Sequence, residues 1–167
     1  MSTILRRQFV RKATVALGTL AAGRIFLRGP LQAQTGAARS PALDLELVKK
    51  FVAAAHTKLD DVKAMLDAEP HLVNATWDWG GGDFETGLGG ASHMGRPDIA
   101  SYLLEKGARM DVFCATMMGK MEIVKACVAD TPGIVHVKGP HGITLLRHAV
   151  MGKQEALVKV LMDAGAT

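Results

Sequence analysis

The sequence predicts an all-α repeat solenoid of about four helix-turn-helix units, with short hairpin loops and one joint that lacks its hairpin. Two observations lead to this prediction. Four segments carry apolar residues at three- and four-residue spacing, which places those residues on one face of a helix. A shorter stretch rich in small residues precedes each segment, and small side chains let paired helices approach closely. The segments are KLDDVKAMLDAEP (58–70), GRPDIASYLLEKGA (95–108), GKMEIVKACVADTPG (119–133) and KQEALVKVLMDAGA (153–166).

The first part of the chain has the order of an export signal. A basic start is followed by an apolar run at 13–23 and then by small residues. Arg6 and Arg7 precede Gln-Phe-Val-Arg at 8–11, and this arrangement resembles the twin-arginine (Tat) translocation motif. The resemblance implies that residues 1–37 form a Tat-like signal peptide and linker, and that the protein is exported folded to the periplasm.

Two further features of this leader concern membrane association and cleavage. The apolar run covers only about half of a ~30 Å hydrocarbon core, so we expect no membrane association of the mature protein. Cleavage after Ala33 and after Ala37 both stay open, although Leu31 stands where a small residue is preferred and Thr35-Gly36-Ala37 fits the pattern better.

The charge of the chain argues against nucleic-acid binding. The net charge is +4, but residues 1–33 hold six basic side chains and no acidic one. Removing these six from the total of 20 leaves 14 basic against 16 acidic residues, so the remainder carries about −2. A slightly acidic body without a basic stripe lacks the footprint that phosphate backbones require.

The repeated segments resemble the ankyrin repeat. The family's inter-helix glycine has counterparts in Gly95 and Gly119, whereas Lys58 and Lys153 replace it. The resemblance covers 43–167 and implies units at approximately 43–75, 76–108, 109–137 and 138–167. It also implies a protein-binding function, because ankyrin-repeat proteins as a family bind other proteins. The other matching positions are the Glu-Ile-Val-Lys of 122–125, the closing Gly-Ala pairs at 107–108 and 165–166, and Thr144, Leu146 and Ala149 of the opening motif.

The spacing between units predicts where the hairpins lie. The steps from Lys58 to Gly95, Gly119 and Lys153 are 37, 24 and 34 residues. The short second step leaves no room for a hairpin between 107 and 115, so we expect hairpins only at 76–88 and 137–143. At the start of the domain, Ser40 and Pro41 predict a helix N-terminus.

No motif for catalysis or for a cofactor is present, and we therefore predict a non-enzyme without a cofactor. The six histidines form no HxxxH or HExxH pair, so the sequence predicts no metal site, with a joint site of His93 and His148 as the alternative. The glycine-rich stretch 80–95 lacks the lysine of a phosphate loop. Cys114 and Cys127 are expected to be packed thiols, with a disulfide as the alternative.

The aromatic residues of the first hairpin are the sharpest functional signal, because they have no core of their own to fill. We expect Trp77 to be packed and Trp79 to be exposed. The leading hypothesis is a non-catalytic protein-interaction module, and the alternative is a ligand- or metal-binding accessory of a periplasmic enzyme. The predicted partner-binding residues are Trp77, Trp79, Asp83, Phe84, Glu85, His93, Arg109, His141 and Arg147.

The last helical segment lacks the polar cap that usually ends a repeat stack. Leu157, Val160 and Leu161 are expected to pack inward, whereas Val158 and Met162 leave the outer side apolar. Either this C-terminal edge forms a weak homodimer or the stack is marginally stable.

Overall fold

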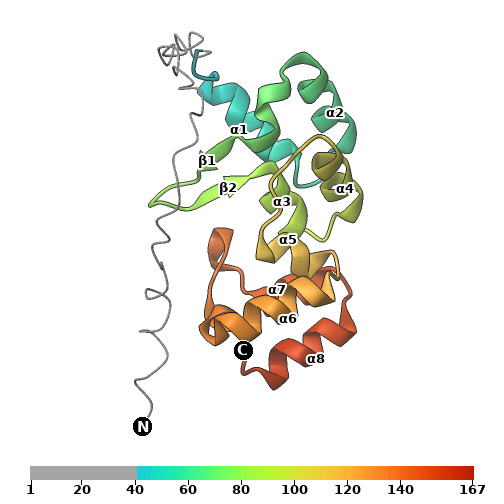
Figure 1. Ribbon diagram of the computed structural model, residues 1–167. Helices are drawn as coiled ribbons and strands as arrows, with labels where there is room; N and C mark the ends of the chain where they lie inside the picture. The colour runs from blue at the N-terminus through green and yellow to red at the C-terminus, as the bar shows by residue number, and fades with distance from the viewer. Residues whose placement is uncertain (1–40) are drawn as a thin grey trace, which may run out of the picture. The chain divides into compact units, whose positions relative to one another are not determined.

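The computed structural model describes residues 41–167 as four antiparallel pairs of α-helices (Figure 1). The predicted export signal lies outside the described residues. Within each pair the two helices contact each other, and the first helices of successive pairs contact in the order α1, α3, α5, α7. The prediction of a mostly helical domain is confirmed. The helices are α1 (Leu45–Ala54), α2 (Leu59–Ala68), α3 (Gly87–His93), α4 (Pro97–Glu105), α5 (Val112–Met117), α6 (Met121–Asp130), α7 (Leu145–Met151) and α8 (Glu155–Asp163).

The first helix of every pair begins at a capping side chain. An oxygen of Asp44, Thr86, Asp111 or Thr144 accepts a hydrogen bond from the backbone N–H three residues later. Such caps satisfy amide groups that the helix itself leaves unpaired. The predicted start at Pro41 is wrong, because Asp44 is the better cap and the helix begins one residue after it.

The turn inside three of the pairs requires a left-handed residue. In these pairs the residue directly before the second helix donates its backbone N–H to the carbonyl oxygen of the residue five positions earlier. Arg96 donates to Ala91 in this way, at 2.9 Å. Gly95, Gly119 and Lys153 supply positive φ values of 64°, 70° and 56°. The first turn is one residue shorter, so Lys58, with φ of −115°, takes the place of Arg96 and not that of Gly95.

Gly95 also marks a close contact between the second and fourth pairs. A Cβ atom added at Gly95 would lie 2.5 Å from the carbonyl oxygen of Met151, at the end of α7. Accordingly α3 contacts α7 directly, as well as α5. The pairs on either side of α5 are therefore near neighbours.

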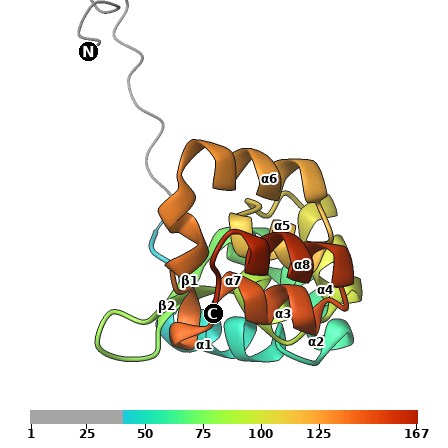
Figure 2. The same ribbon diagram turned by 90° about the horizontal axis from the view of Figure 1, so that it is seen from below.

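The connections between pairs confirm the predicted pattern of hairpins. Strands β1 (Thr76–Asp78) and β2 (Phe84–Thr86) form an antiparallel hairpin that projects to one side of the helices (Figures 1 and 2). The segment 137–143 is a tighter loop, closed by a single bridge from Lys138 to Thr144 around the 3-10 helix η3 (Pro140–Gly142). The residues between Gly107 and α5 form no strand.

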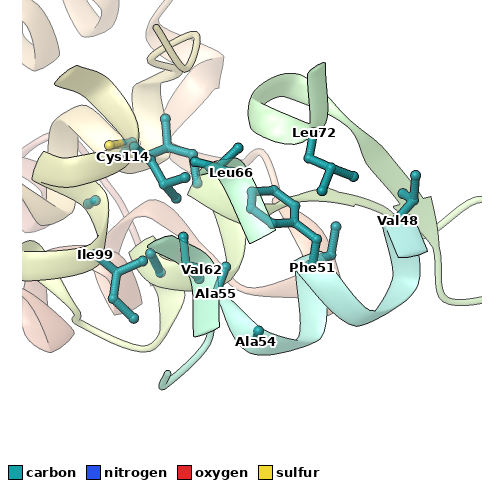
Figure 3. Packing of buried hydrophobic residues seen from close by; sticks show 14 of the residues in the cluster. Val48, Phe51, Ala54, Ala55, Val62, Leu66, Leu72, Ile99 and Cys114 are labelled. Carbon is teal, nitrogen blue, oxygen red and sulfur yellow. The ribbon is translucent and has the colours of Figure 1, made fainter. Parts of the chain in front are cut away.

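Two apolar clusters stabilise the described domain. Phe51, Leu72 and Ile99 lie in the first (Figure 3), and Leu145 and Leu161 lie in the second. Two further 3-10 helices, η1 (Pro70–Asn74) and η2 (Pro132–His136), follow α2 and α6 and contribute one buried residue each.

Both cysteines are free thiols. Cys114 is buried in the first cluster, and burial raises the pKa of its thiol (Figure 3). Cys127 is only partly buried. Packing of a reduced thiol, the leading expectation, therefore describes Cys114 well, and it describes Cys127 in part.

The last helix pair keeps an apolar outer side at Met162, as expected from the sequence, but the expectation for Val158 is wrong, because Val158 packs against the second apolar cluster. Leu157 and Leu161 are buried, whereas the side chains of Val150 and Met162 are exposed. Among residues 41–167, the helices are too short and too polar to cross a membrane.

Candidate metal centre

Four side chains from separate parts of the described domain converge on one point. They are His56 after α1, Glu85 on β2, His93 at the end of α3, and His141 in η3. One potential ligand atom from each lies within 4.8 Å of the others. Imidazole nitrogens and carboxylate oxygens in such a group are the donors that divalent transition metals use.

Equivalent turns position two of these histidines. The carbonyls of Ala54 and Ala91 both accept the hydrogen bond that closes the turn, and His56 and His93 each lie two residues further on. Their rings are 4.8 Å apart, edge to face. Gly90 makes room for this arrangement, because a Cβ atom there would lie 2.9 Å from the ring of His56.

The carboxylate of Glu85 is the centre of the cluster. Its Oε2 accepts a hydrogen bond from Trp79 Nε1 at 2.7 Å and lies 3.4 Å from Nε2 of both His56 and His141. Burial opposes its ionisation most strongly, but the adjacent His93, the indole N–H and the charge of His56 together hold its pKa below the ordinary value. Glu85 is therefore a buried carboxylate anion.

Hydrogen bonds fix the orientation of the two outer imidazoles. Nδ1 of His56 donates to the carbonyl oxygen of Val52 at 2.9 Å, and its Nε2 lies 3.4 Å from Oε2 of Glu85. Nδ1 of His141 lies 2.7 Å from Oδ2 of Asp83, and its Nε2 also faces Glu85. Metal-binding histidines are held in the same way, with one nitrogen on a carbonyl or carboxylate and the other on the ion.

The carboxyl group of Asp83, which holds His141 in place, is also ionised. The backbone N–H of His141 donates to Asp83 Oδ1 at 2.8 Å, and this bond is the main reason that the pKa of Asp83 is lowered. Burial acts in the opposite sense, and the side-chain bond to His141 adds to the lowering. Asp83 therefore anchors the loop of η3 to the β1–β2 hairpin through two hydrogen bonds.

Two buried atoms in the cluster have no hydrogen-bond partner. They are Oε1 of Glu85 and Nδ1 of His93, which face each other as a charged contact at 3.1 Å. Both residues are more than nine-tenths buried. Leaving such a group unsatisfied costs about 1–3 kcal/mol, and more when it is charged. A cation between these two atoms would satisfy both.

The separations fit a first-row transition ion. For metal–ligand bonds of about 2.0–2.1 Å, the corners of a tetrahedron are about 3.4 Å apart. Oε2 of Glu85 lies 3.4 Å from both His56 and His141, and Oε1 lies 3.1 Å from His93, while the four ligand atoms together lie within 4.8 Å of one another. Three imidazoles and one carboxylate suit Zn²⁺, Cu²⁺, Ni²⁺ or Co²⁺ better than Mg²⁺ or Ca²⁺, which prefer oxygen ligands.

Most of the predicted partner-binding residues belong to this cluster, although the sequence assigned them another role. Glu85, His93 and His141 are potential ligands, and Trp79 and Asp83 bind them through hydrogen bonds.

The other four predicted residues lie apart from the centre. Trp77 packs partly against the first apolar cluster, as expected, and Phe84 is exposed. Arg109 and Arg147 are exposed too, on the segment before α5 and on the first turn of α7.

Sequence reasoning missed His56 and chose the wrong partner for His93. His148 lies outside the group of four; it is buried against Phe113, and burial lowers its pKa. The available signal was the Ala-x-His pattern of 54–56 and 91–93, which puts His56 and His93 at the same place in successive units.

The comparisons with known proteins give no family for this chain. No protein-family model matches it, and no curated protein matches it at a significant level. The site's own geometry therefore carries the functional argument.

Replacing Trp79 by Phe should destabilise the protein by about 1.5–3 kcal/mol, since the buried carboxylate of Glu85 loses a charge-assisted hydrogen bond. Trp77→Phe is the matched control, because the Trp77 side chain contributes no such bond to Glu85. Urea unfolding at pH 7 in the presence of EDTA measures both. Equal losses in the two variants would contradict a specific role for the indole of Trp79.

Proposed function

We propose that this protein is a non-catalytic metal-binding module that holds one divalent first-row transition ion through His56, Glu85, His93 and His141. The observation that carries the proposal is the pair of unpartnered buried atoms, Glu85 Oε1 and His93 Nδ1. The hydrogen bonds of His56 and His141 support it, because each holds its ring with Nε2 3.4 Å from Oε2 of Glu85. Of the two functions considered from the sequence, the geometry favours metal binding.

The metal would join parts of the chain that are far apart in sequence. Its ligands come from α1, the β1–β2 hairpin, α3 and η3, so one ion would connect the first, second and fourth helix pairs. Because the unfolded chain offers no assembled site, metal binding would stabilise the folded state. We propose that the four pairs are ankyrin-like units and that a Tat-type signal exports the folded protein to the periplasm, where it binds the ion. The order of the leader and the repeat pattern support these two points.

Zinc should bind with a stoichiometry of one ion per chain and should raise the melting temperature. At a free Zn²⁺ concentration 100 times Kd, the added stability is about 2.7 kcal/mol. For a domain of this size, that corresponds to a rise on the order of 10 °C. Elemental analysis after desalting gives the stoichiometry, and thermal unfolding with Zn²⁺ or with EDTA gives the shift.

Matched variants identify the ligands. Glu85→Gln keeps the size of the side chain but removes the anionic ligand, and we expect it to lose bound zinc and the thermal shift. His136→Gln is the control, because His136 is an exposed histidine outside the cluster. Wild-type protein that retains no zinc, or a Glu85→Gln variant that binds zinc as tightly as His136→Gln, would refute the proposal.

A protein partner is the second candidate function, and the exposed ring of Phe84 favours it. Alternation along β2 directs Phe84 away from the buried Glu85, and 62% of Phe84 is accessible to solvent. A large aromatic residue exposed on a hairpin is typical of an interface anchor.

Replacing Phe84 by Ser should leave both the melting temperature and zinc binding unchanged, because the ring fills no core. The same change should abolish capture of a periplasmic partner by the immobilised protein. An unchanged set of captured proteins would count against this second function, and it would leave the metal centre untouched.

A further inference from the structure

The four candidate ligands differ in their access to solvent. The side chains of Glu85 and His93 are 0% and 6% exposed, whereas those of His56 and His141 are 21% and 34% exposed. Glu85 and His93 therefore form the inner side of the centre. His56 and His141 form its rim.

The rim is also the widest part of the cluster. The ring centroids of His56 and His141 are 6.3 Å apart, compared with 4.8 Å between His56 and His93 and 5.1 Å between His93 and His141. The two rim rings are therefore farther from each other than either is from the ring of His93. The space between the two rim imidazoles lies between the two ligands that are partly exposed to solvent.

From this asymmetry we propose that the metal keeps a coordination position between His56 and His141, and that this position takes a small anionic ligand of the carboxylate or azide class. The inference rests on the proposed metal-binding function and specifies what else the centre binds. A four-ligand site closed on all sides would be purely structural, whereas an open position makes the ion a binding site for a ligand from solvent.

Charge favours an anion at this position. A divalent ion with three neutral imidazoles and the carboxylate of Glu85 retains a net charge of +1. Asp83 contacts the outer nitrogen of His141 and is not in the group of potential ligands, so its charge acts at longer range. A monoanion that replaces water on the ion would neutralise the first coordination sphere in a partly buried site, where charge interactions are stronger than in water.

Trp79 limits the size of the ligand. Its indole ring lies 6.2 Å from the ring of His56 and 6.1 Å from that of His141, so it flanks the gap from one side. Its N–H is already engaged by Glu85, and the rest of the ring presents an apolar wall. The position therefore suits a small anion whose remaining part tolerates an aromatic neighbour.

Cobalt substitution tests this inference directly. The purified chain, freed of metal by EDTA and loaded with one Co²⁺, is titrated with sodium azide and, separately, with sodium acetate while its visible absorption is recorded. We expect a saturable shift of the cobalt bands with one azide per Co²⁺, and a similar saturable shift with acetate. His136→Gln is the control and should titrate like the wild-type protein, because His136 is an exposed histidine outside the cluster.

Each outcome separates the two proposals. Cobalt bands that do not move with azide, while Co²⁺ stays bound after desalting, would overturn the open position and leave the metal-binding function standing. Loss of Co²⁺ to azide would also overturn it, since azide would then be removing the ion. A chain that takes up no Co²⁺ would overturn both.

Discussion

The buried carboxylate of Glu85 is the interaction on which the rest of the candidate site depends. An isolated carboxylate in the protein interior is costly, and it persists only where opposite charge or hydrogen bonds compensate it. Here Trp79 donates one hydrogen bond, and three imidazoles surround the two oxygens. The hydrogen bond at Oε2 leaves Oε1 without a partner, and this imbalance is what makes a bound cation the natural complement.

The missing hairpin explains how such a site can form in a chain of repeated helix pairs. The segment between Gly107 and α5 forms no strand, and it lies along the chain between the β1–β2 hairpin and the loop around η3. With that joint reduced to a few residues, α3 contacts α7, and Asp83 reaches the backbone and ring of His141. The short joint before α5 is therefore the feature that goes with the contact between α3 and α7 and with the meeting of the ligands.

The sequence predicted much of the fold, because the fold depends on local signals. Helix periodicity, the glycine of the turns and the length of each joint are properties of short segments, and they predict the helical pairs and hairpins at 76–88 and 137–143, of which the first forms two strands and the second a tighter loop closed by one bridge. The predicted match of Lys58 to the glycine of the other turns is wrong. The first turn is one residue shorter and needs no left-handed residue, so no glycine marks its position in the sequence.

The site could be predicted only in part. His93, Glu85 and His141 stood out individually, but their meeting depends on the contact across the short joint and on the space that Gly90 leaves for His56. Sequence motifs for metal sites usually consist of ligands at a fixed spacing within one helix. The contact across the short joint and the space at Gly90 produce no such spacing. The hairpin residues that the sequence assigns to one partner-binding surface lie on two sides of the strand. Alternation along β2 directs Glu85 inward toward Trp79 and Phe84 outward.

The most direct measurement is anomalous X-ray diffraction at the zinc absorption edge from crystals of the zinc-loaded protein. The account predicts one strong peak between His56, Glu85, His93 and His141, about 2.0–2.2 Å from each ligand atom. A zinc peak elsewhere on the chain, or an ordered cluster with no anomalous peak at saturating zinc, would contradict it.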